Sequence, residues 1–156
     1  MVDLKGLSDE LKKVKIQIEK VLSISGYRND DDLSALEDFK QIKTADQRQQ
    51  LEEYRDILDK LDDIQYKLVY LEKPIQEVSR IYTNESGRYE TDRGYYYTSG
   101  SGIEFLRTEE VYNDDTDTWE SAEIWTTSRV ESKDGRYYIV GYPNLEMSGL
   151  KVRIRR

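Results

Sequence analysis

The hydrophobic periodicity of the chain changes at Pro74, and this change limits the folds that are open to it. Before Pro74, apolar residues recur every three or four positions, as they do on one face of a helix. After Pro74 they alternate with polar residues, and this part holds seven of the nine Gly, nine of the thirteen Tyr and both Trp. The sequence therefore predicts an α+β protein, with a helical hairpin at residues 1–73, a linker at 74–80 and a small antiparallel β-barrel at 81–156.

Two long helices and a short bridging helix are expected in the first part. Gly26 follows the first helix and favours its termination. A run of Asp at residues 30–32 opens the short helix, and Thr44 followed by Gln47 fits a capping box for the last one, which Pro74 ends. Whether residues 30–73 form one helix or two stays open at this stage. The apolar stripes are Leu4, Leu7, Leu11, Val14, Ile18 and Val21 in the first helix, Leu33, Leu36, Phe39 and Ile42 in the short one, and Leu51, Tyr54, Ile57, Leu58, Leu61, Ile64, Leu68 and Leu71 in the last.

These stripes have two interpretations. They can form the internal seam of an antiparallel hairpin, or they can present a coiled-coil surface to a partner. We favour the internal seam, because two amphipathic helices in one chain can cover each other. A homodimer through a face that the hairpin leaves over stays open.

The residue types that the chain lacks exclude several classes of function. It has no Cys and no His, which removes thiolate nucleophiles, Cys or His zinc sites, disulfides and imidazole bases. We therefore expect no enzyme, no cofactor and no metal site, and catalysis by carboxylates is the remaining enzymatic alternative. No run of apolar residues is long enough to span a membrane, and the start of the chain lacks the pattern of a secretory signal, so we expect a cytoplasmic protein.

Two loops look like ligand-binding motifs but lack residues that those motifs require. The stretch TSGSGIEFL at 98–106 has no Lys and leads into a predicted strand, whereas a phosphate-binding loop leads into a helix. The stretch YNDDTDTWE at 112–120 has alternating Asn113, Asp115 and Asp117, but Thr118 and Ile124 stand where a calcium loop needs Gly and Glu. Both stretches are typical of turns.

Three sets of residues in the second part are candidates for contact with a partner. Residues 104–123 hold eight acids against one Arg, and this is the strongest charge feature of a chain whose net charge is −8. The acidic set is Glu104, Glu109, Glu110, Asp114, Asp115, Asp117, Glu120 and Glu123, and the aromatic set is Tyr96, Tyr112, Trp119 and Trp125. The terminal basic set, Lys151, Arg153, Arg155 and Arg156, is an alternative contact for nucleic acid. The net negative charge disfavours nucleic acid, so we expect protein binding, although the acids can also serve only to keep an exposed hairpin soluble.

The order of short motifs in the second part resembles a family of unknown function found in Firmicutes and their mobile elements. The motifs are TSGSGIE, a Trp-containing strand, RVE, the paired tyrosines of RYYIVGY and the closing GLKVRIR, and the resemblance covers residues 79–156. It implies a Src-homology-3-like barrel with no catalytic residues. It also suggests an acidic inhibitor of a nucleic-acid-handling bacterial protein, such as a CRISPR effector nuclease.

Overall fold

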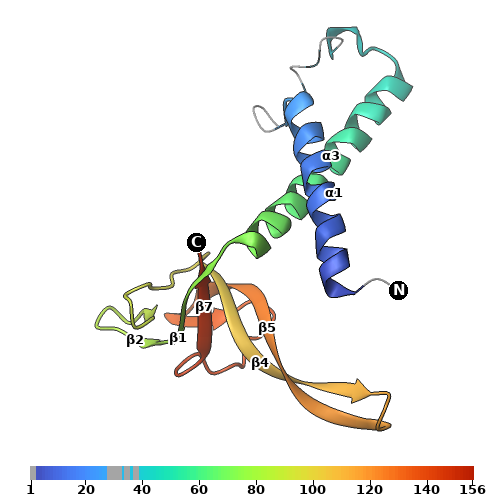
Figure 1. Ribbon diagram of the computed structural model, residues 1–156. Coiled ribbons are helices and arrows are strands. Elements are labelled where there is room, and N and C mark those ends of the chain that lie inside the picture. Colours follow the sequence, from blue (N-terminus) through green and yellow to red (C-terminus); the bar gives the residue numbers. More distant parts are fainter. Residues whose placement is uncertain (1–2, 28–32, 34–35, 37–38) are drawn as a thin grey trace. The chain divides into compact units, whose positions relative to one another are not determined.

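A computed structural model describes residues 3–27, 33, 36 and 39–156 of the chain, and these residues divide into two compact units. Unit 1 is Met1–Lys73 and unit 2 is Pro74–Arg156. The boundary therefore coincides with the change of hydrophobic periodicity at Pro74. Figure 1 shows helices in the first unit and strands in the second.

The helical unit consists of two long helices that run antiparallel and cross (Figure 1). Helix α1 spans Leu4–Ile24, and the Asp3 carboxylate caps its start by accepting a hydrogen bond from the Gly6 backbone N–H at 2.7 Å. Helix α3 spans Ala45–Glu72 and begins with the predicted capping box of Thr44 and Gln47, which is confirmed.

The predicted short helix lies largely outside the described residues. Within its range, Phe39–Gln41 form a single 3-10 turn, η1. Leu33 is buried, and Leu36, Phe39 and Ile42 pack at the edge of the helical core. The remaining buried apolar residues of this core are Ile18, Leu22, Tyr27, Leu51 and Leu58.

The predicted inward stripe of α1 is wrong over most of its length. Leu4 is 87% exposed, Leu7 is 50% exposed and Val14 is 45% exposed, whereas Ile18 and Leu22 are the buried residues of α1. The cause is that α1 turns a different side toward α3: Lys15 pairs with Glu72, and Gln65 donates to Glu19 at 2.9 Å. Except for Ile18, the apolar residues of the predicted α1 stripe therefore lie beside the contact between the helices and not in it.

The β unit contains a five-stranded antiparallel sheet in the order β1-β7-β4-β5-β6. Its strands are β1 (Ile75–Arg80), β4 (Gly102–Asn113), β5 (Thr118–Lys133), β6 (Arg136–Ile139) and β7 (Lys151–Arg155). Two short strands, β2 (Tyr82–Thr83) and β3 (Tyr89–Glu90), form a separate two-stranded sheet. The core lies on one face of the large sheet, where Phe105, Val130 and Val152 are fully buried.

The predicted α+β class and antiparallel sheet are confirmed, but the sheet is not closed into a barrel. Among the described strands, β1 and β6 are the edges and do not pair with each other. The expected linker at 74–80 instead contains β1, which pairs with β7 from Ile75 with Arg155 to Arg80 with Lys151. β6 follows β5 through a tight turn in which Asp134 and Gly135 both have positive φ, as an Asp-Gly hairpin signal predicts.

Candidate functional site

Strands β4 and β5 continue beyond the sheet as a two-stranded ribbon (Figure 1). They pair with each other from Gly102 with Arg129 to Asn113 with Thr118. β7 pairs with β4 at Phe105, and β6 pairs with β5 between Val130 and Lys133. We call residues 107–124 the arm, and the part of the same two strands inside the sheet, residues 102–106 and 125–130, the root.

The tip of the arm is a turn held by its own side chains. The Asn113 side-chain amide donates to Glu120 Oε1 at 2.9 Å, and its oxygen accepts from the Asp115 backbone N–H at 3.0 Å. The Tyr112 hydroxyl donates to the Asp117 carboxylate, and this hydrogen bond raises the pKa of the Tyr112 phenol above its ordinary value. These contacts account for the alternating Asn and Asp as turn residues, and the described residues contain no cluster of acids that could hold a metal ion.

An aromatic pair is exposed beside this turn. Tyr112 and Trp119 are direct cross-strand partners whose rings meet edge to face, with centroids 5.4 Å apart. Tyr112 is 46% exposed and Trp119 is 68% exposed. Large aromatic side chains of this kind are enriched in protein interfaces and scarce on other surfaces.

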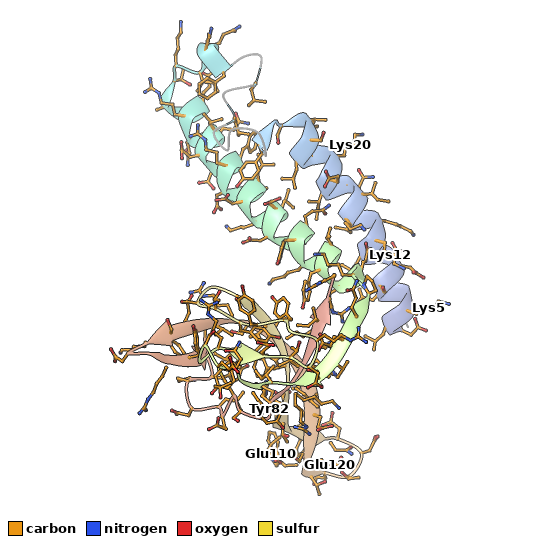
Figure 2. The ribbon with its side chains drawn as sticks, turned by 90° about the vertical axis from the view of Figure 1, so that its left-hand side faces the viewer. Lys5, Lys12, Lys20, Tyr82, Glu110 and Glu120 are labelled. Atoms are coloured by element: carbon orange, nitrogen blue, oxygen red, sulfur yellow. The ribbon has the colours of Figure 1, made fainter. Side chains whose placement is uncertain are left out.

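Most of the predicted acidic set surrounds the aromatic pair. Six of these acids are exposed on the arm: Glu110, Asp114, Asp115, Asp117, Glu120 and Glu123. Figure 2 shows Glu110 and Glu120 on this hairpin. Glu109 is half-buried and pairs with Arg107 at 2.6 Å. The arm as a whole holds seven acids and one Arg, so its formal net charge is −6.

Glu104 does not belong to that surface. It is 3% exposed, in the root, and it accepts from Arg153 Nε at 2.6 Å and from Arg155 Nε at 3.0 Å. Alternation along paired strands explains this arrangement, because Glu104, Arg153 and Arg155 all face away from the core that contains Phe105 and Val152. The structure thus joins one member of the predicted acidic set to two members of the predicted basic set.

The rest of the basic and aromatic sets is distributed over the β unit. Arg153 stacks over Trp125 with its guanidinium carbon 4.5 Å from the ring centroid, and Arg156 lies over Tyr95 at 5.7 Å. The side chains of Arg153 and Arg155 are 17% and 11% exposed, whereas Lys151 is exposed. Tyr96 is exposed outside the arm, with Arg88 over its ring.

Two exposed apolar residues of the arm were not predicted from the sequence as part of the candidate site. Val111 is 37% exposed and Ile124 is 38% exposed. Both lie on the face opposite the aromatic pair, as the strand registers show. Alternation places both residues on the same face of the ribbon. It also predicts that an apolar face is covered by other residues, so nothing in the sequence indicated that these two side chains are exposed.

The Gly-Ser-Gly stretch in the β unit is a structural turn. Gly100 has φ +87° and donates to the Val130 carbonyl at 2.7 Å, and Val130 donates to the Ser101 carbonyl at 2.8 Å. The Ser101 hydroxyl accepts from the Thr98 backbone N–H at 2.9 Å. The loop therefore fastens the start of β4 to β5.

Comparison with protein families identifies the part of the chain that holds the arm and the root. Residues 78–154 match a family model described only as a domain of unknown function. These residues form a DUF5348 domain. Neither a curated protein nor a solved structure matches the chain.

The DUF5348 domain runs from Val78 in β1 to Ile154 in β7, so it includes the whole arm, Glu104 and Arg153, but not Arg155, α1 or α3. No helix in the described part of the chain combines the length and apolar character that crossing a bilayer requires.

Proposed function

We propose that this protein is a non-catalytic protein-binding module whose DUF5348 domain inserts its arm into a positively charged cleft of a partner protein. The observation that carries the proposal is the exposed Tyr112 and Trp119 pair, set among six exposed acids on a ribbon that extends past its sheet. The partner that fits this chemistry has a basic groove with an apolar pocket.

The aromatic pair supports binding because large aromatic side chains with this much exposure are typical of protein interfaces. Tyr and Trp are the residues that most often dominate the binding energy of protein interfaces, where they fill pockets away from water. A two-stranded hairpin outside a sheet is only marginally stable in water by itself. The arm nevertheless places Trp119, at 68% exposed, close to its tip.

The charge of the arm indicates the sign of the partner. A formal net charge of −6 on one narrow ribbon gives a field that attracts basic surfaces and accelerates encounter with them. A nucleic-acid channel is a basic surface of this kind, lined with cations that pair with phosphates. We therefore propose an acidic inhibitor of a nucleic-acid-handling protein, of which a mobile-element inhibitor of a CRISPR effector nuclease is one example.

Contact with nucleic acid through the basic strand has less support. Glu104 pairs with both Arg153 and Arg155 within the β unit, and both guanidinium groups are largely covered. Each phosphate contact requires an accessible cation. Lys151 and Arg156 are the exposed members of the set.

The test is capture of the partner from host cells by the full chain, followed by binding kinetics with variants. Trp119→Ala is expected to weaken binding at least about 30-fold, the loss typical of an interface hot spot. Replacing Asp114, Asp115 and Asp117 by Asn is expected to reduce the association rate and its dependence on salt.

A matched control removes three exposed acids outside the arm, by Glu53→Gln, Asp63→Asn and Glu85→Gln. These changes are expected to leave the association rate close to that of the unmodified chain. Equal effects of the two triple variants, or an unchanged affinity of the Trp119→Ala variant, would contradict the proposal. Tight binding of duplex or single-stranded nucleic acid at physiological salt would favour the basic strand instead.

A further inference from the structure

We infer that Glu110 and Trp119 of the arm form a binding site for an arginine side chain, and that the partner protein supplies this arginine on an extended segment beside β4. The inference rests on the proposed function and names the chemical group of the partner that the arm contacts. It begins from a repeat between the root and the arm. The root contains the same two residue types in the same arrangement, and there an arginine of this chain occupies them.

The occupied pair in the root is Glu104 and Trp125. The guanidinium carbon of Arg153 lies 4.5 Å from the centroid of the Trp125 ring, and Arg153 Nε donates to the Glu104 carboxylate at 2.6 Å. A guanidinium is planar and carries several N–H donors, so it can stack on an aromatic ring and pair with a carboxylate at the same time. The root is therefore a guanidinium site built from one Glu and one Trp on neighbouring strands.

The arm repeats this pair in the same register. In the root, Trp125 stands two residues before the cross-strand partner of Glu104. In the arm, Trp119 stands two residues before the cross-strand partner of Glu110. Each residue is six positions from its counterpart, an even number, so both pairs lie on the same face of the ribbon, about 20 Å apart along the strands. Glu110 and Trp119 therefore have the strand geometry of the occupied pair.

A tyrosine in the arm takes the position that a leucine has in the root. Leu106 is the cross-strand partner of Trp125, and Tyr112 is the cross-strand partner of Trp119. Tyr112 meets Trp119 edge to face, and the Trp119 side chain stays largely exposed. The arm therefore offers a cation a second aromatic ring, in addition to the one that the root provides.

Within the described residues, no cation fills the corresponding position in the arm. The single basic residue of the arm, Arg107, lies on the opposite face of β4, where its guanidinium pairs with Glu109 at 2.6 Å. Glu110 is exposed and has no ion-pair partner in the part of the chain that the structure describes. An arginine at this site therefore comes from another molecule.

The free edge of β4 indicates how that arginine arrives. In the root, Arg153 reaches the site from β7, which pairs with β4 at Phe105 and begins at Lys151. Beyond this point the described strands pair with β4 on one side, through β5, as far as Asn113. An extended segment can add to the other side as a further strand. Such a segment holds an arginine beside Glu110, as β7 does in the root.

The stacking contact makes arginine the preferred cation. The arm has a formal net charge of −6 and attracts cations of any kind, so charge alone does not select between them. A lysine ammonium is a compact and strongly hydrated charge, whereas a guanidinium presents a flat face to an aromatic ring. A site that joins Trp119 to Glu110 therefore selects arginine over lysine.

Titration of the full chain with a short peptide tests the inference without the partner. The probe is the capped peptide Thr-Val-Arg-Val-Thr, and the same peptide with lysine or citrulline in place of arginine is the control. The chain has two Trp residues, so NMR reads the indole N–H signal of each one separately. The arginine peptide is expected to shift the Trp119 signal to saturation, with a dissociation constant of about 1 mM at physiological salt. The Trp125 signal is expected to stay in place, because Arg153 already covers that ring.

The control peptides and the variants test the two halves of the site. The lysine and citrulline peptides are each expected to bind at least about 3-fold more weakly than the arginine peptide, because each lacks one of the two contacts. Glu110→Gln and Trp119→Ala are expected to weaken binding of the arginine peptide at least as much, read from the backbone amide signals of the arm. Asp114→Asn removes the same charge from the turn between β4 and β5, and is expected to weaken binding less than Glu110→Gln does.

Three results would overturn the inference. They are the lack of a saturable shift, equal binding of the arginine and lysine peptides, and equal effects of Glu110→Gln and Asp114→Asn. The peptide comparison uses the unmodified chain, so it does not depend on the folding of any variant. If the inference fails while Trp119→Ala still weakens binding of the captured partner, the proposed function stands, so the two failures are distinguishable.

Discussion

The root and the arm are parts of the same two strands, yet they use charged residues in opposite ways. In the root, Glu104 is buried and accepts hydrogen bonds from two arginines of β7. In the arm, Glu110 lies on the same face of β4, six residues further along, and is exposed. The difference is that β7 covers the side of β4 at the root, whereas arm residues pair only across the ribbon. A carboxylate near a neighbouring strand becomes part of the structure, and one beyond it stays available to a partner.

The largest effect expected from this comparison comes from Glu104→Gln. The substitution keeps the shape of the side chain but removes the charge that compensates Arg153 and Arg155, so we expect the β unit to lose about 3 kcal/mol of unfolding free energy. Urea unfolding followed by Trp fluorescence measures it, because both Trp residues lie in this unit.

Glu110→Gln is the matched control on the arm, and its expected change is below about 0.5 kcal/mol. Similar losses for the two variants would show that the root and the arm do not differ in the way described.

A smaller contrast is expected between the two Trp residues. Trp125 is half-buried in the root beneath Arg153, so Trp125→Ala is expected to cost about 2 kcal/mol. Trp119 contacts Tyr112 at the exposed tip, and Trp119→Ala is expected to cost less than about 1 kcal/mol. Urea unfolding followed by the remaining Trp measures both. The reverse order would mean that the aromatic pair serves the fold and not a partner.

The smallest effect expected is a loss of stability at alkaline pH that originates outside the arm. Burial, and secondarily the nearby Glu146, raise the pKa of the Tyr89 phenol above its ordinary value. The folded unit thus binds this proton more tightly than the unfolded chain does. Its contribution is fully present below the unfolded pKa and is lost as pH rises through the folded pKa.

Urea midpoints measured between about pH 9 and pH 11 are expected to fall with rising pH, and to fall less for Tyr89→Phe. An identical pH dependence for the unmodified chain and the Tyr89→Phe variant would exclude Tyr89 as a cause.

For Tyr112, Asp117→Asn is expected to lower the phenol pKa toward its ordinary value, because it replaces the acceptor carboxylate by a neutral amide. NMR of labelled tyrosine side chains reads that shift directly.

Features set by neighbouring residues could be predicted from the sequence. The Thr44 and Gln47 capping box and the Asp134 and Gly135 turn both depend on side chains within a few positions of each other. The change from helices to strands at Pro74 could likewise be predicted, because it follows from the spacing of apolar residues on each side of Pro74. The acids of residues 104–123 are also close together in the sequence, so they could be assigned to one sheet edge or hairpin, and most of them lie on the arm.

Features set by contacts between residues far apart in the sequence could not be predicted from the sequence. Glu104 and Arg153 are 49 residues apart in sequence, and only the pairing of β4 with β7 shows that they form an ion pair. The periodicity of α1 identified an apolar side but not what covers it, so Leu4 and Leu7 were assigned to a seam that they do not join. Closure of the sheet into a barrel likewise depends on which strands lie at the edges.

The central claim is that the arm binds the partner and the root supports it. Amide hydrogen exchange of the full chain, with and without the captured partner, tests this claim most directly. We expect new protection in residues 107–124, strongest around Tyr112 and Trp119, and unchanged exchange in the already buried strand around Phe105. Unchanged exchange in the arm, with new protection confined to Lys151–Arg155 or to the helices, would contradict it.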